Sequence, residues 1–305
     1  MIKIEGVSKS FNGQKVLKNV SIEIKPGSIY GIIGENGVGK STLIQCLTGV
    51  YKVEEGKILI DGKSIYENNE VKGQIGYVAD KNQFFKSYRV DQMVTFFKEV
   101  YPQFSVERFN TYNQTFKLNP KTKVKNLSKG MQMRLSLMLN MACMPKVLVL
   151  DEPTSGLDAL AKKQVLDLII EEVDETGMTV VISSHHLSEL ERICDEITML
   201  SKGEVVYQSS VEDLKNKVKK LQVVFEKDVP ADLEEWQGIL SVSHVGSVYY
   251  VITNDYSETL EEQLRRAGAL LIETIGLNLE EVFIYTALAR ENEEENQKGE
   301  AYEIR

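Results

Sequence analysis

The chain has few cysteines and prolines, a single tryptophan and no excess of positive charge. Its three cysteines, Cys46, Cys143 and Cys194, are scattered along 305 residues without the spacing of a metal site, so we expect no disulfide framework and a reducing compartment. No apolar run approaches the ~18 residues that span a membrane, and residues 1–5 show no signal-peptide pattern. Acidic residues outnumber basic ones by 45 to 36, which disfavours nucleic-acid binding. These absences predict a cytoplasmic protein without a membrane span.

The most informative segment present is rich in glycine: residues 34–41 fit the phosphate-binding template G-x-x-x-x-G-K-[ST]. The apolar run at 28–33 is typical of a buried strand, and residues 42–47 continue as a helix. A strand, a glycine turn and a helix N-terminus aim backbone N–H groups at one point, where a polyphosphate binds. We expect Lys40 to contact the β- and γ-phosphates and Ser41 to place its hydroxyl on Mg²⁺. The residues expected to bind nucleotide here are Gly34, Asn36, Gly37, Gly39, Lys40, Ser41 and Thr42.

A second motif, at residues 147–152, is an apolar strand that ends in two carboxylates. Four apolar residues in a row suit a strand buried on both faces of a mostly parallel sheet. At the carboxyl end of such a strand, where these sheets bind ligands, Asp151 is expected to orient Mg²⁺. Glu152 is expected to polarise the water that attacks the γ-phosphate. A strand ending in Asp-Glu is common by itself, but together with the phosphate loop it predicts a nucleotide hydrolase.

A third segment, residues 127–132, has the sequence Leu-Ser-Lys-Gly-Met-Gln and precedes a helical pattern that ends before Pro145. Ser128 is a good N-cap for that helix, and its hydroxyl and the helix dipole would favour an anion. An ordinary N-cap without a ligand is the alternative. The chemistry of this segment is therefore open on its residues alone.

The order of these motifs resembles the ATP-binding cassette (ABC) family, in its transporter nucleotide-binding subunits. In that family a Leu-Ser-Gly-Gly-Gln segment contacts the γ-phosphate of ATP held by the partner subunit. The resemblance implies this role for Ser128 and Gly130, although Lys129 and Met131 stand where the family usually has Gly and Gln. Residues 155–158 resemble the D-loop that communicates between the two sites.

The family also implies a switch histidine one strand later. The apolar strand at 180–185 ends in His185, which would hydrogen-bond the γ-phosphate and steady the attacking water. The next residue, His186, is expected to point to the other side of the chain and is given no role.

Two further site positions follow from the resemblance. The family stacks an aromatic ring on adenine from a hairpin near the N-terminus, and Phe11 matches that position, with packing in the hairpin as the alternative. The family also has a glutamine that touches Mg²⁺ and the attacking water. The strand at 74–79 leads there to Asp80, which can coordinate Mg²⁺ but cannot donate a hydrogen bond when ionised. Gln83, three residues on, is the alternative.

The fold implied is an α/β P-loop NTPase cassette over residues 1–215, with a mostly parallel central sheet, an N-terminal antiparallel β part and a helical subdomain at about 81–135. Seven of the ten phenylalanines fall between Asp80 and Ser128. Most of these rings are expected to pack the subdomain. The alternative is that Phe84, Phe85 and Tyr88 line a groove for a short helix of a membrane-embedded partner.

The C-terminal third has a different pattern. Strand-like runs at 221–225, 239–245 and 247–252, with a hairpin near Gly246, and helical runs at 259–264 and 279–284 predict a small α+β domain over residues 216–290. His244 and Trp236 are expected to be packing residues. The charged tail at 291–305 is expected to be disordered.

The leading hypothesis is the ATP-hydrolysing subunit of an ABC transporter of the bacterial exporter type, with ATP and Mg²⁺ as cofactors. It would pair with a second ABC ATPase subunit, as a homo- or heterodimer, and power a separate membrane-embedded subunit from the inner face of the cell membrane. One alternative is a soluble ABC-type ATPase acting on DNA or ribosomes, which the acidic charge and single cassette disfavour. The other is a non-hydrolysing regulatory subunit, which Lys40, Asp151, Glu152 and His185 disfavour.

Overall fold

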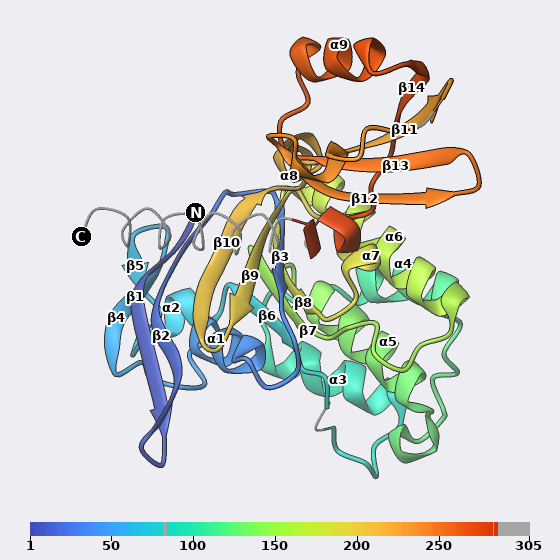
Figure 1. Ribbon diagram of the computed structural model, residues 1–305. Helices are drawn as coiled ribbons and strands as arrows, with labels where there is room; N and C mark the ends of the chain where they lie inside the picture. The colour runs from blue at the N-terminus through green and yellow to red at the C-terminus, as the bar shows by residue number, and fades with distance from the viewer. Residues whose placement is uncertain (82–83, 228, 283, 286–305) are drawn as a thin grey trace. The chain divides into compact units, whose positions relative to one another are not determined.

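The computed structural model describes residues 1–81, 84–227, 229–282 and 284–285. The predicted alternative Gln83 and the tail at 291–305 lie outside these residues. Contacts within the chain divide it into two units, Met1–Gln208 and Ser209–Arg305, each of which is described by itself (Figure 1).

The first unit begins with an antiparallel sheet in the order β2-β1-β4-β5. Isoleucines alternate with polar residues in its strands, so one face is buried: Ile2 and Ile4 pair with Ile24 and Ile22 on one side and with Ile60 and Ile58 on the other. This confirms the predicted N-terminal antiparallel part. The strands are β1 (Ile2–Phe11), β2 (Gln14–Ile24), β4 (Glu55–Ile60) and β5 (Lys63–Ser64).

A second sheet in the same unit has the order β10-β9-β3-β8-β7-β6, and β9, β3, β8, β7 and β6 pair in parallel. Every residue of β3, β7 and β8 is buried, as expected for strands covered on both faces. The predicted mostly parallel central sheet is confirmed. Its strands are β3 (Ile29–Ile33), β6 (Ile75–Val78), β7 (Val147–Asp151), β8 (Thr179–Ser184), β9 (Glu196–Ser201) and β10 (Glu204–Ser210).

Helix α1 (Lys40–Leu47) provides apolar side chains that join the two sheets into one core. Its Leu43, Ile44 and Leu47 belong to the same buried cluster as the isoleucines of β1 and the valines of β7. Cys46 lies in this cluster as a free thiol, and burial raises its pKa to about 11. Burial likewise raises the pKa of Cys143 to about 12, so both thiols stay protonated at neutral pH. The three cysteines are free, as predicted.

Helices α3, α4 and α5 make up the predicted helical part. Phe104, Phe109, Tyr112 and Phe116 are buried there, which confirms packing as the role of these rings. Phe85 is 50% exposed and does not fit that role. The helices of the first unit are α2 (Asn69–Lys72), α3 (Val90–Val100), α4 (Val106–Phe116), η1 (Val124–Asn126), α5 (Lys129–Met141), α6 (Ala159–Thr176) and α7 (Leu187–Leu190).

The second unit is an antiparallel sheet in the order β12-β13-β11-β14, with a core that includes Leu221, Val223, Leu260 and Leu264. The hairpin predicted near Gly246 is present, whereas strand β14 was not predicted. Trp236 packs against the core, but His244 is exposed and stacks on Tyr249, so packing was wrong for His244. The elements are α8 (Val211–Lys217), β11 (Lys219–Phe225), η2 (Leu233–Glu235), β12 (Ile239–Val245), β13 (Val248–Thr253), α9 (Glu258–Arg266) and β14 (Ala269–Ile275).

Candidate functional site

Three predicted motifs leave the parallel sheet at the same edge. Ile33, the last residue of β3, lies opposite Ser184 of β8, and Asp151, the last residue of β7, lies opposite Ser183. Because parallel strands share their carboxyl edge, the phosphate loop, the two carboxylates and His185 emerge side by side. The register of the sheet therefore brings together residues that are more than 140 positions apart in the chain.

The phosphate loop needs glycine at its two ends. Gly34 and Gly39 have φ angles of +152° and +112°. A Cβ on Gly34 would lie 2.4 Å from the carbonyl oxygen of Leu200, and one on Gly39 would lie 3.0 Å from that of Val16. Backbone atoms cannot yield to such contacts, so a side chain at either position would displace the loop. The loop leads directly into α1, whose N-terminal N–H groups are free to bind an anion.

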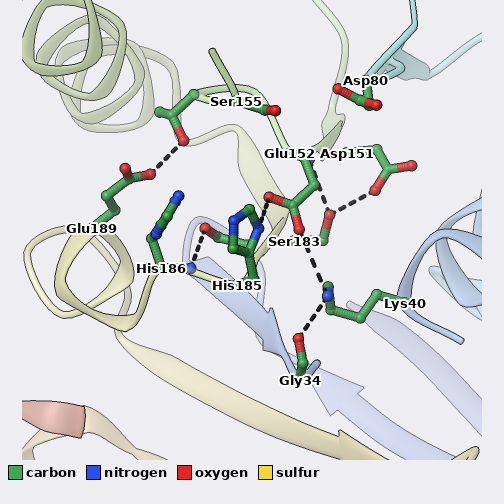
Figure 2. A network of polar contacts seen from close by, with 12 residues as sticks. Gly34, Lys40, Asp80, Asp151, Glu152, Ser155, Ser183, His185, His186 and Glu189 are labelled. Atoms are coloured by element: carbon green, nitrogen blue, oxygen red, sulfur yellow. Dashed lines mark hydrogen bonds and ion pairs between the residues drawn. The ribbon is translucent and has the colours of Figure 1, made fainter. Parts of the chain in front are cut away.

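Lys40 is the first residue of α1 and its side chain is only 5% exposed. Its Nζ donates hydrogen bonds to the carbonyl oxygens of Gly34 at 2.6 Å and Glu35 at 3.1 Å, and lies 3.6 Å from Glu152 Oε1 (Figure 2). The carbonyl oxygens of the loop thus hold the ammonium group of Lys40 within the loop. A buried cation at this point attracts anions that approach the helix N-terminus.

Asp151 is 4% exposed and its Oδ1 accepts hydrogen bonds from two hydroxyls, Ser183 Oγ at 2.7 Å and Ser41 Oγ at 3.1 Å. A serine hydroxyl and a carboxylate at this distance are hard oxygen donors of the kind that Mg²⁺ prefers. Within the described ranges no cluster of three or more His, Cys, Asp or Glu side chains could hold a metal alone. The pair therefore fits a Mg²⁺ ion that takes its other ligands from phosphate and water.

Glu152 leaves the strand in a left-handed conformation, with φ of +51°. Its N–H is held by Ser183, through the carbonyl oxygen at 3.2 Å and Oγ at 3.1 Å. Its Oε2 lies 2.8 Å from His185 Nδ1, while Oε1 is buried and accepts no hydrogen bond from the described residues (Figure 2). A buried carboxylate oxygen left without a donor is suited to bind a water molecule.

His185 therefore contacts Glu152 directly. The ring of His186 lies 3.9 Å from the ring of His185, so the expectation that it points to the other side of the chain was wrong. Both rings lie at the start of α7, whose Glu189 carboxylate accepts a hydrogen bond from Thr154 Oγ1 and pairs with Lys162 at 2.7 Å. This network joins the segment after Glu152 to the segment after His185.

A pocket of about 250 Å³ lies over the loop. Phe11 is not among the residues that line it; its ring is 37% exposed and lies 5.1 Å from that of Tyr51. Phe11 therefore does not pack in the core of the hairpin, which was the alternative role given to it. The residues lining the pocket are Val16, Asn36, Gly37, Gly39, Lys40, Ser41, Thr42, Asp80 and Glu152.

The residues expected to bind another subunit's nucleotide lie outside this pocket. Ser128 is the N-cap of α5, as predicted, and its Oγ accepts a hydrogen bond from Met131 N at 3.2 Å. A Cβ on Gly130 would lie 2.7 Å from Leu157 Cδ2, so glycine lets the helix start pack on the D-loop. Asp80 does line the pocket, but its Oδ1 lies 3.0 Å from Lys129 Nζ.

Two residues of the site were not found from the sequence. Ser183 is one serine in a strand with a neighbouring serine, and nothing local distinguishes the two. Val16, on β2, approaches Gly39 only because the antiparallel sheet packs beside α1. Ser183 could have been found only by predicting that β8 pairs with β7 and places this residue opposite Asp151.

A glycine loop at a helix N-terminus with a buried lysine, beside a strand-end Asp-Glu pair, defines a P-loop nucleoside triphosphatase. Residues 17–155 match the family described as ABC transporter. The chain is 34% identical to the ABC transporter ATP-binding protein YtrB of Bacillus subtilis (strain 168) over 284 residues, which are 93% of this chain and 97% of that protein. The chain belongs to the ATP-binding proteins of ABC transporters.

Solved structures agree with this membership. One is the dimeric structure of a post-hydrolysis state of the ATP-binding cassette MJ0796 bound to ADP and Pi, with 25% identity and a TM-score of 0.63 over 69% of this chain and 99% of that one. Another is cbiO1 from Clostridium perfringens, part of the ABC transporter complex cbiONQ, with 30% identity and a TM-score of 0.61 over 70% and 89%. The predicted cassette fold is confirmed.

The protein is therefore an ATPase subunit that binds ATP and couples its hydrolysis to transport, as predicted. No helix in the described part of the chain is both long and apolar enough to cross a membrane.

Replacing Ser183 by Ala should lower ATP turnover on the order of tenfold, because a hydrogen bond to a charged group is worth roughly 1.5–3 kcal/mol. The change removes one of the two hydroxyl donors to Asp151 and one of the two acceptors of the Glu152 N–H, while the phosphate loop is untouched. Steady-state turnover and equilibrium ATP binding, measured side by side, check this. Ser184→Ala is the matched control, since Ser184 Oγ accepts a hydrogen bond from His186 N and contacts neither Asp151 nor Glu152. Equal losses in the two variants would contradict a specific role for Ser183.

Proposed function

We propose that the ATP of this subunit binds over the phosphate loop with Mg²⁺, and that Glu152 is the base that activates the attacking water. The observation that carries this proposal is the contact set of Glu152: one oxygen faces Lys40 at 3.6 Å and the other lies 2.8 Å from His185. The subunit would pass the energy of hydrolysis to a separate membrane subunit from the inner face of the cell membrane.

The loop supplies the phosphate contacts. Lys40 would exchange the carbonyls of Gly34 and Glu35 for phosphate oxygens, which compete well because they carry negative charge. Ser41 and Asp151 would hold Mg²⁺, which neutralises phosphate charge when bound. Asp80 was predicted as a third ligand, but its Oδ1 lies 3.0 Å from Lys129 Nζ, and we assign it no metal contact. The exposed ring of Phe11 stays the predicted platform for adenine, with Tyr51 beside it.

We assign the proton transfer to Glu152, which His185 positions. Glu152 Oε1 would accept a proton from water, and Lys40 Nζ lies 3.6 Å from this oxygen. His185 Nδ1 fixes the other oxygen and so aims Oε1 into the pocket. With Nδ1 engaged, Nε2 remains to contact the γ-phosphate.

Two copies of the cassette would close on two ATP molecules, with Ser128 and Gly130 of one copy meeting the γ-phosphate on the other. The start of α5, a helix of 13 residues, offers N–H groups and a positive dipole end for that contact. The MJ0796 cassette named above is dimeric, which supports pairing of this chain with a second ATPase subunit.

The membrane partner is proposed to dock in a groove of about 670 Å³ beside Asp80. Phe84 and Phe85 line it, whereas Tyr88, the third residue predicted there, is not among the lining residues; its ring lies 5.0 Å from that of Phe85. The remaining rings of the groove come from β6 and α3. The lining aromatic residues are Tyr77, Phe84, Phe85, Phe96, Phe97 and Tyr101. The aromatic rings of this groove suit the apolar face of a short helix.

The proposal excludes nucleic acid as a partner, supported by a net charge of −9. Membership in a transporter family favours it over an ATPase acting on DNA or ribosomes. Export, the direction expected from the sequence, stays a prediction.

Glu152→Gln should lower ATP turnover by roughly 10²–10⁴-fold, the usual contribution of a general base, because an amide cannot accept the water's proton. ATP affinity should change little, since Gln keeps the shape of the side chain. Turnover and binding of a fluorescent ATP analogue are the measurements. Hydrolysis at the wild-type rate would show that another group is the base.

Ser128→Arg in the Glu152→Gln background should abolish ATP-driven dimerisation. The Glu152→Gln protein retains ATP, so light scattering should show a shift from monomer to dimer with MgATP. A bulky Arg at the start of α5 would occupy the space of the partner's γ-phosphate, while ATP binding to the monomer persists. If the double variant still dimerises with ATP, α5 does not meet the partner's nucleotide.

Phe85→Asp should prevent co-purification of the membrane partner, because it places a charge among the aromatic rings of the groove. The side chain is 50% exposed, so the fold and the ATPase rate of the isolated subunit should hold. Val245→Asp, a 72% exposed residue of the second unit, is the control. A pull-down from detergent-solubilised membranes should recover a multispanning protein with the control and not with Phe85→Asp. Equal recovery with both would place the docking surface elsewhere.

A further inference from the structure

Asp80 lies where three hollows of the first unit meet. It lines the pocket over the phosphate loop, the aromatic groove, and a third pocket of about 620 Å³. The third pocket is strongly basic, in a chain whose net charge is −9. Its lining residues are Asp80, Lys81, Lys86, Lys125, Lys129 and Gln132.

Lys129 is the lysine of this pocket that contacts Asp80. Its Nζ lies 3.0 Å from Asp80 Oδ1 and 3.3 Å from Ser155 Oγ, so the ammonium group connects the end of β6, the start of α5 and the D-loop. Among the described residues Lys81, Lys86 and Lys125 form no ion pair.

Each of the three carboxylates around the phosphate loop has its own compensating partner. Asp151 accepts two hydroxyl hydrogen bonds, Glu152 faces Lys40, and Asp80 faces Lys129 (Figure 2 shows the three carboxylates). The three partners are not equivalent. Lys40 and the hydroxyls lie within the phosphate site, whereas Lys129 approaches from α5, outside it. Without Lys129, Asp80 would present an unpaired negative charge to an incoming triphosphate, and like charges repel.

We propose that Lys129 is a positioning residue for the nucleotide site of its own chain: its ammonium neutralises Asp80 and holds that carboxylate away from the triphosphate. Two of the positions at which the sequence departs from the family pattern, Asp80 and Lys129, thus contact each other, and their charges are opposite. The proposal rests on the nucleotide site proposed above. It makes ATP affinity depend on the start of α5 in the same chain.

The test is a double-mutant cycle on ATP affinity with Lys129→Met, Asp80→Asn and both together. Lys129→Met should weaken binding of a fluorescent ATP analogue about threefold to fivefold, the upper part of the range expected for one exposed charge pair. Adding Asp80→Asn should restore affinity to within about twofold of wild type, because the charge to be compensated is gone. The loss in Lys129→Met should shrink between about 0.05 M and about 0.5 M salt, since screening weakens repulsion. A purely structural role of Lys129 would show neither the rescue nor this salt dependence.

Lys125→Met is the matched control, because it removes a lysine from the same pocket and leaves the pair intact. A loss in Lys125→Met equal to that in Lys129→Met would overturn the proposal, since general positive charge would then explain it. Losses that add in the double variant would also overturn it. A large loss in Asp80→Asn alone would instead make Asp80 a ligand of the bound MgATP.

Lys40→Ala, measured in parallel, separates this inference from the proposed nucleotide site. A loss of ATP binding in Lys40→Ala together with additive losses in the cycle rejects only the role of Lys129. Unchanged ATP affinity in Lys40→Ala rejects the nucleotide site itself. Thermal unfolding of each variant shows that the fold is retained.

Discussion

The rest of the site depends on one hydroxyl, that of Ser183. It donates to Asp151 Oδ1 at 2.7 Å and accepts from the N–H of Glu152 at 3.1 Å, so it fixes two adjacent residues with different tasks. The contact exists because β7 and β8 pair in parallel with Asp151 opposite Ser183. Asp151 can then reach Ser41 in α1, while Glu152 turns left-handed and reaches Lys40 and His185. The register of the sheet thereby sets the positions of the site residues relative to one another.

Charge compensation is the second constraint. A phosphate site needs carboxylates for metal and proton transfer, yet it must attract a polyanion, and a buried charge without a partner is costly. Lys40 meets both needs, because it is buried between the loop carbonyls and Glu152. Further out, Glu189 accepts from Thr154 and pairs with Lys162, which ties the segments after Glu152 and His185 to each other. The acidic groups of the site are thus matched individually by their contacts.

Much of the fold could be predicted from the sequence, because its signals are local. Strands covered on both faces are continuous apolar runs, as in β3 and β7. The hairpin was predicted from a glycine between two β-rich runs, and Gly246 does adopt the positive φ, +62°, that glycine allows. Strand β14 was missed because Ala-Leu-Leu-Ile does not alternate and its Leu270 and Leu271 are exposed. The 284-residue match to YtrB covers 93% of the chain and so must include most of the second unit.

The sequence by itself determined the phosphate loop, the Asp151-Glu152 pair and the N-cap at Ser128, because each is a short segment whose chemistry depends on its own backbone. Only the tertiary structure decided which distant groups meet these segments. Ser183 binds Asp151, His186 stacks beside His185 instead of pointing away, and Lys129 crosses from α5 to Asp80. The physical reason is that hydrogen bonds and ion pairs form only within about 3–4 Å. The distance between two residues along the sequence does not tell whether their side chains come that close; strand register and helix packing decide it.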